Sequence, residues 1–124
     1  MNALVLNLLW VAAGGALGSV ARAAIGMAIQ SRFPWSTLLI NVTGSCLIGW
    51  LMARVGPAQA PEALSLRSLL VTGFCGGYTT FSTFSWQTLE EMQKGQWFAA
   101  GANVLLSVGL SLAAVWLGFR LGRA

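Results

Sequence analysis

The sequence is poor in charged residues and contains neither histidine nor aspartate. Lys, Arg, Asp and Glu make up 8% of its 124 residues, and the only acids are Glu62, Glu90 and Glu91. An ordinary soluble domain has about 25% charged residues. Without histidine or aspartate, Ser–His–Asp catalysis, most general acid–base chemistry and His-based metal sites are excluded. The composition therefore predicts a protein that is not an enzyme.

The few charges are spaced so that they leave long uncharged windows, at Met1–Ala21, Phe33–Ala53, Ser68–Leu89 and Gly95–Phe119. Each window meets the roughly 20 residues that a helix needs to cross about 30 Å of hydrocarbon. We therefore predict an all-α membrane protein, one domain over residues 1–124 with four spans at about 4–27, 35–54, 66–92 and 97–121. The one sizeable loop is expected at Gly56–Ser65, which contains Pro57, Pro61 and Glu62.

Basic residues and tryptophans lie mainly near the predicted span ends, as membrane anchors do. The net charge of +4 is scattered over these ends, so we expect lipid and not nucleic acid as a partner. No Lys or Arg precedes Arg22, so the first window lacks the positive start of a signal peptide and is predicted to be a retained helix. Cys46 and Cys75 fall within spans, where a free cysteine behaves as a small apolar residue.

The distribution of basic residues also bears on orientation. With an even number of spans both termini lie on one side, and an excess of Lys and Arg normally fixes which side that is. Here the two sides carry four and three basic residues: Arg54, Arg67, Arg120 and Arg123 against Arg22, Arg32 and Lys94. This near balance is compatible with insertion in both orientations and favours an antiparallel, dual-topology homodimer.

The first span carries a row of small residues at i, i+4 spacing, formed by Gly14, Gly18 and Gly26 with Arg22 in the same row. Small residues at this spacing allow two membrane helices to approach closely. For Arg22 two interpretations stay open. The side chain either snorkels to the interface or draws anions into a vestibule.

The third span contains the most unusual segment, Gly73–Ser85, in which glycines are followed by hydroxyls and aromatics. Lipid offers no partners for backbone N–H and C=O groups, so a loosened helix at this depth indicates a polar task. Two interpretations of Gly73–Thr80 remain. The break either frees carbonyl oxygens for a monovalent cation such as Na⁺, or is a kink that serves packing.

Further polar residues are placed to line a pathway. Asn103, Ser107 and Ser111 recur at i, i+4 and i+8 on one face of the fourth span, and Asn41 lies in the second. Phe81 and Phe84 are i, i+3 neighbours interleaved with Ser82, Thr83 and Ser85. Aromatic rings have a positive edge, so rings turned edge-on can help a small anion to lose water. The pattern favours passive ion passage.

Gly73–Ser85 resembles the signature of the Fluc (CrcB) fluoride channels, as do Gly18–Arg22, Thr37–Gly44 and Asn103. The resemblance covers nearly the whole chain. It implies a dual-topology homodimer in the plasma membrane (the bacterial inner membrane) that exports fluoride passively and protects the cell from it. It also implies a structural Na⁺ held by main-chain oxygens of Gly76 and Thr79.

The same resemblance implies roles for individual side chains. Asn41, Phe81 and Phe84 match the pore residues of the family, Ser82, Thr83, Ser107 and Ser111 match its polar track, and Arg22 matches its vestibule arginine. One position departs from the family, because Gln87 stands where members often have glutamate.

The main alternative is a small proton-coupled multidrug exporter with four helices. Such a transporter needs a protonatable carboxylate inside a span. Glu62, Glu90 and Glu91 all fall in the predicted loop or at a span end. A purely structural membrane subunit, the other alternative, leaves the interrupted third span and its phenylalanine pair unexplained.

Overall fold

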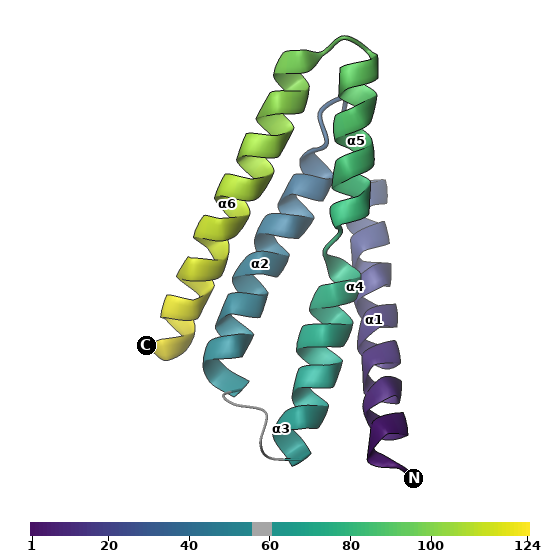
Figure 1. The fold of residues 1–124 in the computed structure, drawn as a ribbon, viewed down its shortest axis with the longest axis vertical. Helices are drawn as coiled ribbons and strands as arrows, with labels where there is room; N and C mark the ends of the chain where they lie inside the picture. The colour runs from purple at the N-terminus through teal and green to yellow at the C-terminus, as the bar shows by residue number, and fades with distance from the viewer. Residues whose placement is uncertain (56–60) are drawn as a thin grey trace.

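The structure, a computed structural model, describes residues 1–55 and 61–124, with only the backbone of residues 61–63. All regular elements in these ranges are helical (Figure 1). In chain order they are α1 (Ala3–Ala28), α2 (Trp35–Val55), α3 (Pro61–Leu66), the π-helix η1 (Arg67–Cys75), α4 (Gly76–Tyr78), α5 (Phe81–Gln93) and α6 (Trp97–Arg123).

Three of the predicted spans are single helices. In the described residues α1, α2 and α6 are long and apolar enough to cross a membrane, and their ends lie within two residues of the predicted ones. The third span consists of η1, α4 and α5 in succession, preceded by α3. Both termini lie toward the same end of the molecule (Figure 1). The four-helix prediction with an interrupted third span is compatible with this architecture.

The predicted loop at Gly56–Ser65 is wrong in its second half. Residues 56–60, with Pro57, lie outside the described residues, but the chain is helical again from Pro61. Proline suits the first position of a helix because its φ is already helical and its missing N–H has no partner there. The side chain of Glu62 is not described.

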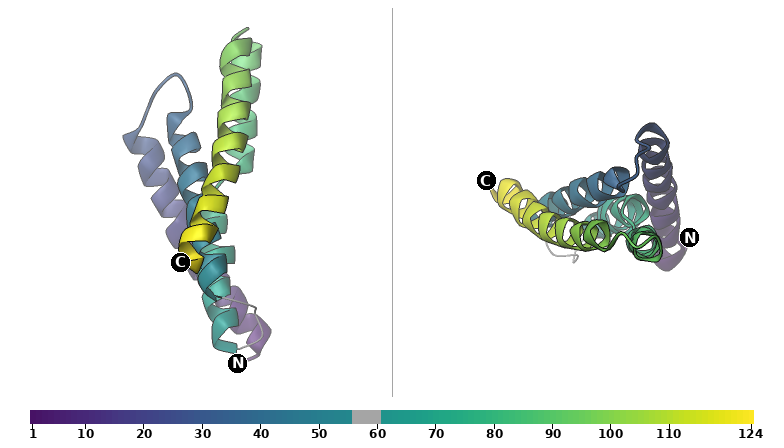
Figure 2. Two further views of the ribbon diagram at one scale, coloured as in Figure 1. Left: turned by 90° about the vertical axis from the view of Figure 1, so that its left-hand side faces the viewer. Right: turned by 90° about the horizontal axis from the view of Figure 1, so that it is seen from above.

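The third span lies between α1 on one side and the pair of α2 and α6 on the other (Figure 2). On one side α1 packs along η1 and α4, and on the other α2 packs along α6, which also contacts α5. The turn at Lys94–Gln96 joins α5 to α6 as predicted. Gly95 has the positive φ of 75° that this turn needs, and its N–H donates to the Met92 carbonyl.

Glycines make the close contact between α1 and the third span. A Cβ on Gly14 or Gly18 would collide with the backbone at Leu69 or Phe74. On the opposing helix, a Cβ on Gly77 would lie 2.5 Å from the Gly15 carbonyl oxygen. The predicted close approach is confirmed at Gly14 and Gly18, whereas a Cβ on Gly26 would meet nothing within 4 Å.

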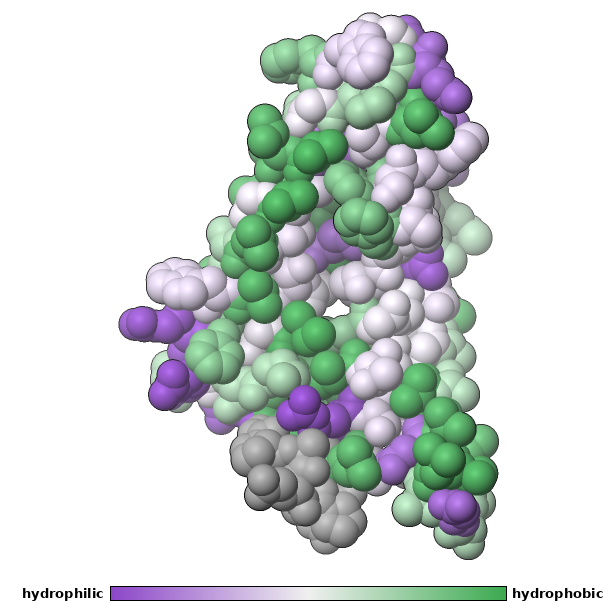
Figure 3. Space-filling view, viewed as in Figure 1, coloured by the Kyte–Doolittle hydropathy of each residue, from purple (hydrophilic) through white to green (hydrophobic). Residues whose placement is uncertain are grey.

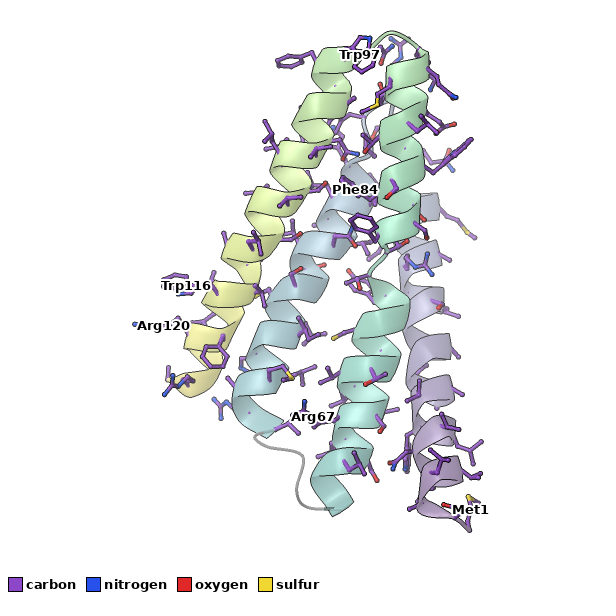
Figure 4. The ribbon with its side chains drawn as sticks, viewed as in Figure 1. Met1, Arg67, Phe84, Trp97, Trp116 and Arg120 are labelled. Atoms are coloured by element: carbon purple, nitrogen blue, oxygen red, sulfur yellow. The ribbon has the colours of Figure 1, made fainter. Side chains whose placement is uncertain are left out.

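Hydrophobic residues cover much of the face shown in Figure 3, and many large apolar side chains are exposed, as contact with lipid requires. All six tryptophans are exposed. Arg120 stacks 5.6 Å from the Trp116 ring, and both point away from the bundle on the outer side of α6 (Figure 4). An arginine stacked on a tryptophan is a suitable anchor at headgroup depth. The thiols of Cys46 and Cys75 are both free.

Candidate functional site

The interruption of the third span is short and follows the glycines instead of coinciding with them. Gly76 has helical φ and ψ of −64° and −38°, and the helix continues to Tyr78. Thr79 and Thr80 are extended, with ψ of 157° and 118°. The predicted break at Gly73–Thr80 is therefore confined to its last two residues. Of the glycines before it, Gly73 and Gly77 serve the contact with α1.

Asn41 of α2 completes the backbone at this break. Its side-chain Oδ1 accepts from the Thr80 N–H at 2.8 Å, and its Nδ2 donates to the Thr80 carbonyl at 3.0 Å. The amide thus pairs both polar backbone groups of an extended residue that no helix satisfies. Asn41, which the sequence predicts to be a pore residue, therefore has a structural task at the break.

The two helix ends at the break are capped by side chains. Arg22 of α1 donates from Nε to the Gly77 carbonyl at 3.0 Å, which places a cation at the C-terminal end of α4. Thr79 Oγ1 donates to the Cys75 carbonyl at 2.8 Å. Thr80 Oγ1 accepts from the Thr83 N–H at 3.2 Å and so acts as the N-cap of α5. Threonine is a common N-cap residue, but the sequence analysis did not predict this role for Thr80.

Gly76 differs from its neighbours because it faces open space. A continuous helix would direct the Thr80 N–H to the Gly76 carbonyl, but that N–H bonds Asn41 instead. Gly76 is exposed, and a Cβ placed on it would meet nothing within 4 Å. The break thus removes the helical donor from a carbonyl on the surface of the single chain.

A groove of about 580 Å³ runs past the break, between α2, the third span and α6. The space-filling view shows this face hollowed near its middle (Figure 3). The groove brings together seven predicted site residues: Asn41, Gly76, Thr79, Phe81, Phe84, Ser107 and Ser111. Ser45, Thr72 and Thr80, which were not predicted as site residues, also line it.

Three predicted site residues lie outside this groove. Thr83 takes part in the cap of α5, Ser82 Oγ lies 3.4 Å from Thr80 Oγ1, and Arg22 is on the α1 side of the break. Their predicted roles in ion passage stay predictions.

The phenylalanine pair stands at the start of α5, directly after the break. The ring centroids are 5.5 Å apart and the rings are tilted by 54°. Phe84 is 7% exposed and lies on the side of α5 toward α2 and α6 (Figure 4), whereas Phe81 is 78% exposed. Because so large a ring is uncovered at the groove, the site is open on one side in the single chain.

A buried chain of hydrogen bonds joins α5 to α6 beside Phe84. Thr88 Oγ1 donates to the Phe84 carbonyl at 2.8 Å, and Asn103 Nδ2 donates to Thr88 Oγ1 at 2.9 Å. Ser107 Oγ donates to Asn103 Oδ1 at 3.2 Å. Asn103 is 1% exposed. The predicted stripe on the fourth span is thus buried at Asn103 and reaches the groove at Ser107 and Ser111.

Tyr78 anchors α4 just before the break, a role that the sequence analysis did not predict. Its hydroxyl lies 2.9 Å from Thr43 Oγ1, and its ring stacks on Phe74 with centroids 5.7 Å apart. Gly44 makes room for it, since a Cβ there would lie 3.1 Å from the Tyr78 ring. This contact fixes α4 against α2 just before the break.

Comparison with known proteins assigns the chain to a family. The family model described as CrcB-like protein, Camphor Resistance (CrcB), matches residues 9–119. The chain belongs to the CrcB family. Relatives named fluoride-specific ion channel FluC include those of Rhodospirillum rubrum, 48% identical over 118 residues (91% of this chain and 92% of the relative), and Rhizobium meliloti, 46% identical over 126 residues (95% and 97%).

Within this CrcB-family chain, Gln87 stands on α5 one turn after Phe84. Its Oε1 is buried and has no hydrogen-bond donor among the described residues. The side chain of Glu91, one further turn along, is also buried, close to the turn into α6. Neither residue lines the groove.

Replacing Asn41 by leucine tests whether its amide holds the break. Asn41→Leu leaves the Thr80 N–H and C=O without partners, and each unpaired buried group costs about 1–3 kcal/mol. We expect the free energy of unfolding in detergent micelles to fall by at least about 1 kcal/mol, measured by denaturation followed by circular dichroism.

Ser45→Ala is the matched control, because Ser45 lies one turn along α2 and lines the same groove, and its hydroxyl forms no hydrogen bond with the described residues. It should change the free energy by less than about 0.5 kcal/mol. Equal stability of the two variants would show that the amide does not hold the break.

Proposed function

We propose that this chain is a passive, fluoride-selective channel that releases fluoride across the plasma membrane and so protects the cell from fluoride toxicity. The observation that carries the proposal is family membership, with relatives of nearly the same length named fluoride-specific ion channels. The groove supports it, since it gathers Asn41, Phe81, Phe84 and the serines of α6 along one path.

Selectivity for a small anion follows from what lines the groove. None of the described lining residues is charged, so no fixed cation holds chloride or fluoride by charge alone. In the proposed pathway, hydroxyl and amide N–H groups replace part of the water around fluoride, and the phenylalanine rings, tilted by 54° to each other, would turn their positive edges toward the anion. A narrow path with these groups favours the anion that is small enough to approach them.

Passive transport is favoured over proton coupling. A proton-coupled exporter needs a carboxylate along its path. The chain has three acids, and none of them is among the described lining residues. The exporter alternative therefore has no residue to carry the proton within the groove.

The proposed pathway is completed by a second copy in the opposite orientation. In the single chain Phe81 is 78% exposed and Gly76 is open, although both line the groove. Burying such surface against protein is favourable only where the two surfaces fit closely, and glycine allows close fit. The nearly equal numbers of basic residues on the two sides permit both orientations.

The main-chain oxygens of Gly76 and Thr79 would hold a structural Na⁺ at this contact. The donor set fits the ion, because uncharged carbonyl oxygens suit a hard monovalent cation. The Gly76 carbonyl is suitably placed, as the break diverts its helical donor to Asn41. With the ion bound, these residues would join the two copies and would not contact the permeant anion.

Efflux from liposomes tests the function directly. Vesicles that contain the purified chain and are loaded with fluoride and chloride should release fluoride rapidly and retain chloride, as followed with ion-selective electrodes. Empty vesicles are the control. An equal chloride leak would contradict the proposal, and fluoride efflux that requires a proton gradient would favour the exporter.

The same assay tests the phenylalanine pair. Phe81→Ile and Phe84→Ile remove the ring edges but keep an apolar side chain, and each should slow fluoride efflux by about threefold or more. Phe98→Ile is the matched control, because Phe98 is 91% exposed at the start of α6 and lies outside the groove. If all three variants conduct like the parent, the rings of α5 serve packing alone.

Valine at Gly76 tests the second copy. In the single chain Gly76→Val has free space, so a folding defect is not expected. If another copy covers this position, the added side chain collides with it, and light scattering in detergent should show dimers replaced by monomers. Gly101→Val, at an equally open glycine of α6, should remain dimeric. Dimers of both variants would place the contact elsewhere.

A further inference from the structure

The hydrogen-bond chain between Phe84 and Ser107 has a fixed direction. It ends on the Phe84 carbonyl, which only accepts, so the Thr88 hydroxyl must donate to it. The Thr88 oxygen is then left as an acceptor, and the Asn103 amide presents Nδ2 to it. Asn103 Oδ1 therefore faces Ser107, and the Ser107 hydroxyl must donate.

This direction decides what Ser107 offers to the groove. A hydroxyl has one proton and two lone pairs, and the proton of Ser107 points into the protein toward Asn103. Ser107 thus presents lone pairs to the groove. Ser111 also lines the groove, one turn along α6, and its hydroxyl forms no hydrogen bond with the described residues. Its proton is free for a ligand.

We propose that Thr88 and Asn103 are positioning residues that hold the Ser107 proton away from the groove. Ser107 then accepts a hydrogen bond from water that accompanies the anion, and direct donation to the anion falls to Ser111. The inference rests on the proposed fluoride function. It assigns different roles to Ser107 and Ser111, for which the sequence predicts the same role. It also gives Thr88 a role, although Thr88 does not line the groove.

The hydrogen-bond chain also suggests a substitution that would reverse the direction of its last bond, the one between Asn103 and Ser107. Removing the Thr88 hydroxyl deprives Asn103 Nδ2 of its acceptor at a site where Asn103 is 1% exposed. A buried N–H without an acceptor is tolerated less than a carbonyl oxygen without a donor. The amide therefore turns, so that Nδ2 donates to the Ser107 oxygen and Oδ1 is left facing residue 88. The Ser107 proton is then released toward the groove. The variant should bind fluoride more tightly than the parent.

Thr88→Val tests this reversal with little change of shape. The initial efflux rate at low fluoride concentration should rise about two- to tenfold, the worth of one added hydrogen bond. Thr88→Ser keeps the hydroxyl and should behave like the parent. Adding Ser107→Ala to Thr88→Val should abolish the gain. A purely structural role of Thr88 predicts a loss of flux in Thr88→Val, and that result would overturn the proposal.

A second measurement does not depend on conduction. In detergent, the side-chain amide protons of Asn103 should exchange slowly with solvent in the parent and in Thr88→Ser, and faster in Thr88→Val, as measured by ¹⁵N NMR. If the parent conducts no fluoride, the proposed function fails, while the exchange rates still test the hydrogen-bond chain. If the parent conducts but exchange is the same in all three proteins, the positioning role fails alone.

Discussion

The pairing of the Asn41 amide with the backbone of Thr80 is the interaction on which the site depends. Inside a membrane no water is present to form hydrogen bonds with an unpaired backbone N–H or C=O. A helix can therefore be interrupted only where other protein groups supply the missing partners. One side-chain amide provides a donor and an acceptor at 3.0 and 2.8 Å, and so replaces the neighbouring turn of helix. Two residues can thereby remain extended between α4 and α5.

The rest of the site depends on this pairing of Asn41 with the Thr80 backbone. Because Asn41 takes the Thr80 N–H, the Gly76 carbonyl loses its helical donor on an open surface, and the Gly77 carbonyl is capped by Arg22. The helix that restarts at Phe81 carries the phenylalanine pair past the groove. Glycine packing holds these parts together, since α1 can bring Arg22 to the break only if Gly14 and Gly18 let it approach.

The sequence predicts the spans well and the break only approximately. The lengths of the uncharged windows suffice to predict α1, α2 and α6, because a helix that crosses the bilayer needs about 20 residues with few charges. The glycines of the third span predict a break at Gly73–Thr80, but in lipid glycine also serves close packing. Gly73 and Gly77 are helical residues that face α1. What interrupts the helix is a partner 39 residues away, Asn41, and no local pattern contains that pairing. Likewise, the spacing of Asn103, Ser107 and Ser111 predicts that they share one face of a helix. It does not predict that Asn103 bonds Thr88 on α5.

Counting the hydroxyl groups along such a path is therefore a poor guide to anion binding. An anion is bound by protons, and a hydroxyl whose proton is engaged elsewhere offers only repulsive lone pairs. Thr79 donates to the Cys75 carbonyl, Thr80 to Thr83 Oγ1 and Ser107 to Asn103, so three of the hydroxyls that line the groove already have their protons engaged. The polar surface then divides into groups that can donate, such as Ser111, and groups that can only receive from water. A path of this kind removes part of the water from a small anion while keeping the remainder bound to the wall, which lowers the barrier to entry without creating a deep well that would trap the ion.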